Sequence, residues 1–303
     1  MTKKEMKQIQ NEVSKKTMDI YSGILFNNQK FEESNNTKVV YNFDCPEFVT
    51  LKEKYNLEEI AGKGSDYKKA KKLLHYLSQR LTHSSWYDNH VPCNALDLLE
   101  YSLNNPEHGI NCLNKAKILE ECCLALGIYA RRVSIMPYSP YDFDNHVVTE
   151  IYDRKLKKWI MLDPTTDGIF VDDEGTPLSL LEIRHKFANA EFVTYVQSID
   201  RLKDLKKLKE KYIEKNSYIC KNLYFFYIDK VSTFGETGEK LVFVPVNYSI
   251  KEKLMANMKY RINNIPEEYK DWIPKFEKKL KDLKEYQEDE RTNISSMSNS
   301  PID

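Results

Sequence analysis

The sequence predicts an α+β protein in which helices come first and antiparallel strands follow. Apolar and small residues recur at intervals of three and four over residues 66–81, 95–103 and 112–126, as in helices that bury one face. From residue 130 onwards, short runs rich in β-branched and aromatic residues alternate with polar turns, as in strands. Helices followed by neighbouring strands are typical of the α+β class.

The first forty residues are polar and rich in Lys and Asn, with one apolar patch at 20–26. They predict an N-terminal extension, which is either a helix docked on the body or a loose segment. The first strongly patterned helix follows at 66–81, where four leucines share one face, and a second covers 95–103. The segment between these two helices has the composition of a loop.

A third helix is expected to begin at or next to Cys112. The residues that recur on its buried side are Ala116, Leu119, Cys123 and Leu126. Asn111 is one candidate for the N-cap, and Gly127 supplies the signal that ends the helix. A thiol at such an N-terminus meets the positive end of the helix dipole, which favours a thiolate. The free N–H groups there can also stabilise an oxyanion.

A β-hairpin is predicted after the strand at 130–136 and a loop at 137–145. Its strands are 145–152 and 159–162, joined by a polar run. If Tyr152 pairs with Lys157 across a four-residue loop, His146 and Asp163 lie directly opposite each other. Their Cβ atoms would then be about 4.5–5.5 Å apart on the same face of the sheet. A carboxylate in that place can hold the imidazole in one tautomer.

The C-terminal part of the sequence predicts further short elements. Residues 201–215 have the pattern of a surface helix, and two strand-like runs at 223–229 and 240–248 flank a turn that contains Gly235 and Gly238. The charged stretch 266–288 is helical in pattern, and Pro274 is expected to kink or restart it. Its apolar stripe, which consists of Trp272, Phe276, Leu280 and Leu283, is expected to face the core.

Cys112, His146 and Asp163 are the residue types of a thiol nucleophile, its base and the group that orients the base. Taken singly, each has a structural interpretation, as a small buried thiol, a satisfied strand histidine and a turn. An alternative site is a zinc ion held by His83, His90 and Cys93, although no fourth ligand is evident. Trp86 or Asn89, in the loop before 95–103, is a candidate second oxyanion donor; the sequence does not choose between them.

Four stretches of the sequence carry a family resemblance: Cys112 with Ala116 four residues on, "LGIYARRV" at 126–133, "HVVTE" at 146–150, and "LDPT" at 162–165. Together they resemble the transglutaminase-like superfamily of papain-type thiol enzymes, as a bacterial-type member, over roughly 66–190. The resemblance implies that Cys112 is the nucleophile, His146 the general base and acid, and Asp163 the orienting carboxylate. Asn111 and Val147 depart from the usual pattern, which leaves the subfamily and substrate open. The paired-Cys zinc site and the calcium sites of some relatives have no counterpart in this sequence.

The composition along the chain and the resemblance together predict a division of the chain. The expected parts are an N-terminal extension at 1–40, a papain/transglutaminase-like catalytic core at 41–190 with the Cys helix packed on an antiparallel sheet, a C-terminal α/β extension or small domain at 191–290, and a disordered tail at 291–303. The expected activity is acyl transfer on an amide through a Cys thioester, with hydrolysis favoured. The alternatives are a protein-glutamine amine transferase (crosslinking) and a non-catalytic peptide-binding module of the same fold. A protein or peptide is the expected substrate, without a cofactor or metal.

Composition narrows the class of protein further. The 303 residues include 46 basic and 46 acidic ones, so that no basic field for nucleic acid is expected. The N-terminus lacks the apolar run of a signal peptide, and no run of 18 apolar residues occurs, which argues against secretion and membrane spanning. Six scattered Cys do not suggest a disulfide framework. We therefore expect a cytoplasmic protein; its oligomeric state is left open.

Overall fold

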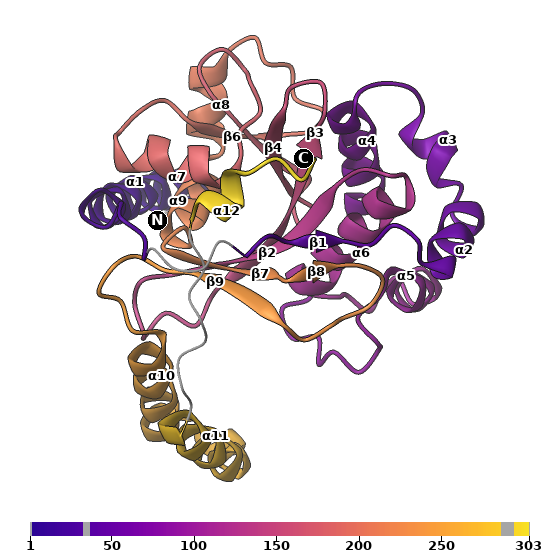
Figure 1. Ribbon diagram of the computed structural model, residues 1–303. Helices are drawn as coiled ribbons and strands as arrows, with labels where there is room; N and C mark the ends of the chain where they lie inside the picture. Colours follow the sequence, from indigo (N-terminus) through magenta and orange to yellow (C-terminus); the bar gives the residue numbers. More distant parts are fainter. Residues whose placement is uncertain (1, 33–36, 286–293, 303) are drawn as a thin grey trace.

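A computed structural model describes residues 2–32, 37–285 and 294–302 of the chain. In these residues seven strands form one antiparallel sheet in the order β6-β5-β4-β3-β2-β7-β9 (Figure 1). The strands are β2 (Ala130–Met136), β3 (His146–Asp153), β4 (Lys158–Asp163), β5 (Gly168–Val171), β6 (Thr194–Gln197), β7 (Phe225–Asp229) and β9 (Lys240–Phe243). Two short strands, β1 (Val40–Tyr41) and β8 (Val231–Ser232), pair in parallel beside it.

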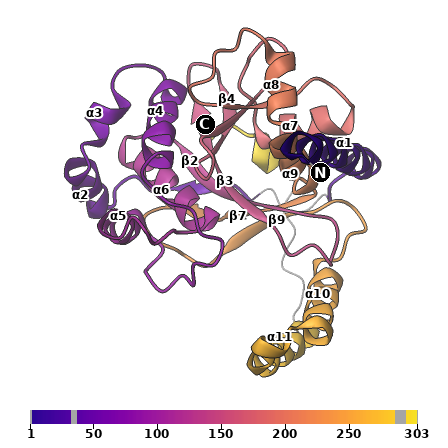
Figure 2. The ribbon, with the colours of Figure 1, turned by 180° about the vertical axis from the view of Figure 1, so that it is seen from behind.

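Helices cover both faces of the sheet (Figures 1 and 2). On one side lie α2 (Pro46–Lys54), α3 (Leu57–Ala61), α4 (Asp66–Ser78), α5 (Ala95–Asn104) and α6 (Cys112–Ala125). On the other lie α1 (Lys3–Asn27), α7 (Leu180–Ala188) and α9 (Ile213–Lys221). α8 (Leu205–Lys211) contacts the edge strand β6, and its Leu205 and Leu208 pack against the core on the α4 to α6 side. The predicted α+β class, with the Cys helix α6 packed on an antiparallel sheet, is confirmed.

The strands are apolar on both faces because each face has its own core. Ile151, Ile160 and Leu162 point to the core shared with α4, α5 and α6. Val148 and Met161, which alternate with them, point to the core shared with α7 and α9. Alternation with a period of two therefore sorts the strand residues between two helical layers. His146, Val148 and Glu150 share one face by the same rule.

The N-terminal residues form one long helix. α1 begins with a capping box, in which Thr2 accepts from the Glu5 N–H and the Glu5 carboxylate accepts from the Thr2 N–H. The helix packs along α9 and α7, and Leu25 is buried in the core on that side. Of the two alternatives left open by the sequence, the structure has the docked helix.

Strands β6, β7 and β9 come from the C-terminal part of the chain and lie in the same sheet as β2 to β5. After β9 the chain leaves the body as a pair of helices, formed by α10 (Ile250–Asn264), the 3-10 turn η1 (Glu267–Trp272) and α11 (Ile273–Glu285). We call α10, η1 and α11 the helical arm (Figure 1). Pro274 is the second residue of α11, where proline is tolerated, so the helix restarts there as expected. The predicted division into domains stays a prediction.

Residues 294–302 pack against the body, although they were expected to belong to a disordered tail. This segment contains α12 (Ser295–Ser298), and the Met297 side chain is 1% exposed. The Met297 carbonyl accepts from Arg131 at 2.6 Å, and the Asn299 carbonyl accepts from the Trp159 ring N–H at 2.9 Å. Composition alone missed these contacts because they depend on donors from distant strands. Residues 291–293 and 303 of the expected tail lie outside the described residues.

Candidate active site

Cys112 is the first residue of α6 and lies half-buried at the helix N-terminus. Asn111 is the N-cap, since its side-chain oxygen accepts from the Asn114 N–H at 3.2 Å. The Lys115 N–H bonds the Asn111 carbonyl, as the first bond of the helix. In the described part of the chain no acceptor takes the N–H of Cys112 or Leu113, so both remain available to a ligand beside the sulfur.

The hairpin that carries His146 has a register two residues away from the predicted one. Its ladder ends on Asp153 paired with Lys158, where Tyr152 was expected to pair with Lys157. The Asp153 carboxylate causes the shift, because it accepts from the N–H groups of Lys155 and Leu156 at 2.8 Å each and so closes the turn. A shift of two residues keeps every side chain on its predicted face.

His146 and Asp163 are therefore diagonal neighbours and are not directly opposed as predicted. The diagonal separation on a sheet is about 7–8 Å between backbones, which long side chains can bridge. Nε2 of His146 lies 3.0 Å from Oδ2 of Asp163, and both side chains are almost fully buried. The contact has the distance of an ion pair, while the ring N–H does not point straight at the oxygen.

Two further donors hold the carboxylate of Asp163. Its Oδ1 accepts from the Thr165 N–H and its Oδ2 from the Thr166 hydroxyl, both at 2.9 Å. Burial alone would raise the pKa of Asp163, but the charge of His146 and these hydrogen bonds hold it below its usual range. Asp163 is thus held as a carboxylate beside the ring.

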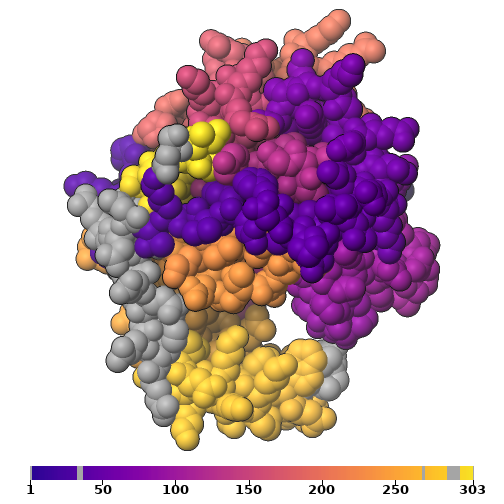
Figure 3. All heavy atoms as spheres, turned by 45° about the vertical axis from the view of Figure 1, so that its right-hand side comes forward, coloured from indigo at the N-terminus to yellow at the C-terminus, as the bar shows by residue number. Residues whose placement is uncertain are grey.

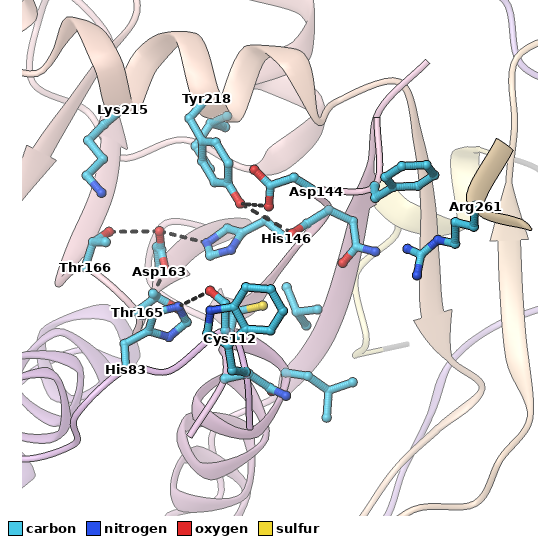
Figure 4. Close-up of a pocket in the computed structure, with 18 of the residues that line it drawn as sticks. His83, Cys112, Asp144, His146, Asp163, Thr165, Thr166, Lys215, Tyr218 and Arg261 are labelled. Atoms are coloured by element: carbon cyan, nitrogen blue, oxygen red, sulfur yellow. Dashed lines mark hydrogen bonds and ion pairs between the residues drawn. The ribbon is translucent and has the colours of Figure 1, made fainter. Parts of the chain in front are cut away.

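Cys112 and Asp163 act on the same imidazole. Burial alone would lower the pKa of His146, but the charge of the Asp163 carboxylate 3.0 Å away, followed by the neighbouring Cys112, raises it well above its usual value. Figure 4 shows the sulfur beside the ring, on the side away from Asp163. The three side chains that the sequence analysis singled out therefore meet at one place.

The third flank of the imidazole is covered by Tyr218 from α9. The two rings meet edge to face with centroids 5.4 Å apart. The Tyr218 hydroxyl donates to the Asp144 carboxylate at 3.1 Å, within the loop that precedes His146 (Figure 4). Tyr218 was not identified from the sequence, because it belongs to a helix that follows the hairpin by more than fifty residues and carries no motif.

These groups open into a cavity of about 1190 Å³. Its walls come from the α6 N-terminus, the loop 137–145, α9 and the helical arm, and Figure 3 shows the hollow between the arm and the body. The aromatic and cationic residues that line it are His83, Trp86, Phe143, His146, Tyr195, Lys215, Tyr218, Tyr260, Arg261, Trp272 and Phe276. Trp272 and Phe276 were expected to face the core; Trp272 instead lies 54% exposed on the cavity wall. Helical spacing identifies an apolar face but not what lies opposite it.

The alternative zinc site does not assemble. His83 lines the cavity, whereas His90 and Cys93 lie beside a separate hollow with Glu236. His90 pairs with Asp88, and the Cys93 sulfur accepts from Arg132 at 3.4 Å. Among the described residues no group of three His, Cys, Asp or Glu could hold a metal ion. Of the two candidate oxyanion donors, Trp86 lines the cavity with Cys112, while Asn89 accepts from the Asn111 side chain at 3.0 Å.

The part of the chain that contains Cys112, His146 and Asp163 matches a family model. Residues 54–164 match the model of the transglutaminase-like superfamily, a segment that includes Cys112, His146 and Asp163. This part of the chain is similar to the core of that superfamily. The match confirms the resemblance found in the sequence and supports a cysteine-dependent enzyme, without specifying the reaction.

Among the solved structures that match part of the chain is a crystal structure named "Putative Cysteine Protease" from Cytophaga hutchinsonii. It shares 18% identity over 54% of this chain and 55% of that chain, with a TM-score of 0.31. The match thus spans about half the length of that protein, and so distant a likeness carries no argument about the reaction. A comparison with curated proteins finds no match. In the part of the chain that the structure describes, no helix has the length and apolar character needed to cross a membrane.

Proposed function

We propose that the transglutaminase-like core catalyses acyl transfer on an amide, with Cys112 as nucleophile, His146 as general acid and base, and Asp163 as the carboxylate that orients His146. The observation that carries the proposal is the contact of one imidazole with both the Cys112 sulfur and the Asp163 carboxylate, at the wall of a large cavity. A nucleophile, its base and the group that orients the base are the arrangement that thiol acyl transfer needs.

The reaction begins when the Cys112 sulfur attacks the carbonyl carbon of the amide and a C–S bond forms. The N–H groups of Cys112 and Leu113 are placed to stabilise the oxyanion. His146, whose raised pKa keeps the ring protonated near neutral pH, donates a proton to the departing nitrogen as the C–N bond breaks. The product of this half-reaction is a thioester on Cys112 and a free amine or ammonia.

The second half-reaction resolves the thioester. Water attacks its carbonyl while His146 takes a proton from the water, and the Cys112 sulfur leaves with an acid as product. We favour water over an amine because the cavity of about 1190 Å³ is open to solvent at exposed residues such as Trp86, which is 93% exposed. A protein or peptide amide is the proposed substrate, since the cavity exceeds the roughly 300–1,000 Å³ of common small-molecule pockets.

The test is a glutamine-peptide assay with and without a labelled primary amine. Ammonia release without incorporation of the amine is the expected result, and incorporation would identify a crosslinking transferase instead. Cys112→Ala should abolish turnover. Cys45→Ala removes another half-buried thiol, which is not in the cavity lining, and should preserve turnover. A folded wild type that binds peptides but turns none over would favour the non-catalytic binding module.

A further inference from the structure

Arg261 of α10 presents an unusual cation on the cavity wall across from the imidazole (Figure 4). Its guanidinium lies over the Phe143 ring at 4.4 Å from the centroid and 5.8 Å from that of Phe276. Its Nε donates to the Asn257 side chain at 3.2 Å. The stem and one N–H are therefore fixed, and the outer N–H groups face the cavity.

No carboxylate among the described residues pairs with Arg261. Two buried arginines of the sheet have carboxylate partners, Arg131 with Glu150 at 2.6 Å and Arg132 with Asp229 at 2.8 Å. The buried Arg184 has backbone carbonyls instead, since it donates to Leu223 at 2.9 Å and to Asn28 at 2.6 Å. Burial lowers the pKa of Arg261, and no neighbouring anion opposes that effect. A half-buried guanidinium without an anion gains more from an anionic ligand than a solvated one does.

The remaining charges of the cavity strengthen this asymmetry. Lys215 adds a second exposed cation without a carboxylate partner in the described part of the chain. The acid at the rim, Asp144, is already engaged by the Tyr218 hydroxyl and by Lys221 at 3.5 Å. Asp163 is occupied by His146. Arg261 and Lys215 are therefore two cations of the cavity lining without a carboxylate partner among the described residues, although the chain as a whole has a formal net charge of zero.

Aromatic rings surround Arg261. Tyr260 and Trp272 are 40% and 54% exposed, and both line the cavity. Phe143 packs against Tyr260 with centroids 5.5 Å apart, and Trp272 against Phe276 at 6.4 Å. These rings offer an apolar surface on both sides of the cation, where a peptide segment could bury its aliphatic atoms.

We propose that Arg261 selects substrates in which an acidic side chain accompanies the attacked amide, so that the substrate class of the Cys112 site is an acidic peptide segment. The carboxylate accepts two hydrogen bonds from the outer N–H groups of Arg261, and Lys215 adds attraction at longer range. The aromatic rings of the arm contact the neighbouring chain atoms. This inference rests on the proposed function for the identity of the reacting group, but the charge preference is a property of the cavity itself.

The experiment measures peptide binding by calorimetry to Cys112→Ala protein, in which no turnover occurs. The probes are glutamine peptides with amidated C-termini. Each carries Glu, Gln or Lys at one flanking position, and that position is moved along the peptide from one set to the next. We expect roughly tenfold tighter binding of the best Glu peptide than of its Gln counterpart, the size of a charged hydrogen bond. Arg261→Gln should abolish the preference, and Arg261→Glu should shift it towards the Lys peptide.

Lys259→Glu is the control matched to Arg261→Glu, because it makes the same change of charge at an exposed position of α10 outside the cavity lining. The acid preference should survive it. The inference is overturned if Lys259→Glu removes the preference as well. It is also overturned if Arg261→Gln weakens the binding of all peptides equally, because that result is expected of a residue that only holds the arm against the loop 137–145.

Activity separates this inference from the proposed function. In otherwise wild-type protein, Arg261→Gln should raise KM for the Glu peptide and leave kcat unchanged. An acid preference in binding without any turnover would contradict the acyl transfer and leave the charge preference intact. Turnover of the Glu and Gln peptides with equal kcat/KM would contradict the charge preference and leave the acyl transfer intact.

Discussion

The Nε2 of His146 lies 3.0 Å from Oδ2 of Asp163 although the two residues are diagonal, two positions out of direct opposition across β3 and β4. The imidazole spans the offset, and the carboxylate is held by Thr165 and Thr166 so that it cannot turn away. A diagonal pair needs such support, because neither backbone position alone sets the contact.

Asp163→Asn should leave the fold intact and lower kcat/KM by roughly 10²–10⁴-fold, since the amide can no longer stabilise the imidazolium or select its tautomer. The pKa of His146 should fall at the same time, because Asp163 is the main cause of its rise. NMR titration of the His146 ring and steady-state kinetics check the two effects. Activity within twofold of wild type would show that turnover does not depend on the orientation of His146 by Asp163.

The same pair predicts a pH dependence of stability. The raised pKa of His146 stabilises the fold fully below the pKa of a free histidine, about 6.5, and this contribution declines as pH rises through the folded value. The lowered pKa of Asp163 stabilises the fold above the pKa of a free aspartate, about 3.9, and this contribution declines as pH falls through the folded value. The combined effect is therefore greatest between these two free-state pKa values.

Urea unfolding of wild type and Asp163→Asn at about pH 3, 5.5 and 9 measures this window. The difference in free energy of unfolding should be largest at the middle pH and smaller on both sides. A difference of the same size at all three pH values would mean that His146 and Asp163 do not form an ion pair in the folded protein.

Gly168→Ala tests a support that lies behind the site. A Cβ at Gly168 would come within 2.3 Å of the ring of Tyr195, which is 1% exposed and cannot move freely. The Tyr195 hydroxyl donates to the Thr166 carbonyl at 2.7 Å, and the Thr166 hydroxyl donates to Asp163. We expect a loss of about 1–3 kcal/mol in stability and up to about a 100-fold loss in kcat.

Gly23→Ala is the matched control, because no atom lies within 4 Å of a Cβ at that position of α1. Thermal unfolding and kinetics of both variants are the measurements. Equal behaviour of the two alanine variants would contradict a supporting role for the contact between Gly168 and Tyr195.

Glu150→Ala should destabilise the fold by about 3–5 kcal/mol, as expected when one partner of a buried ion pair is removed. Glu150 accepts from Arg131 at 2.6 and 3.1 Å and from the Leu180 N–H at 2.8 Å, so its loss leaves a buried guanidinium and a helix end unsatisfied. Urea unfolding gives the value. Arg131→Met added to Glu150→Ala should recover part of the loss; no recovery would show that the Leu180 contact, rather than the ion pair, dominates.

Several of the helices and strands could be predicted from local sequence. The strand at 130–136 and the start of the helix at Cys112 have the predicted bounds, since β-branched residues and an Asn cap act over a few neighbouring positions. The hairpin register was wrong by two residues because the side chain of Asp153 closes the turn, and that contact cannot be counted from strand composition. The faces survived the error because two is the period of a strand.

The residues of the cavity wall could not be predicted from local sequence patterns. The stripe that contains Trp272 and Phe276 has helical spacing, which is the same for a face buried in the core and for one that borders a cavity. Arg261 is one cation in a highly charged segment, and only its place beside Phe143, more than a hundred residues earlier, distinguishes it. Tyr218 likewise has meaning only through the ring it covers.

Trapping of the acyl-enzyme tests the central claim most directly. A glutamine peptide is mixed with the protein, the reaction is quenched in acid within the first turnover, and the modified residue is located by peptide mass spectrometry. We predict an acyl adduct on Cys112 that is lost in Cys112→Ala and accumulates in His146→Asn only at a greatly reduced rate. Substrate turnover that persists in Cys112→Ala, or an acyl adduct found on another cysteine, would contradict the assignment of Cys112 as the nucleophile.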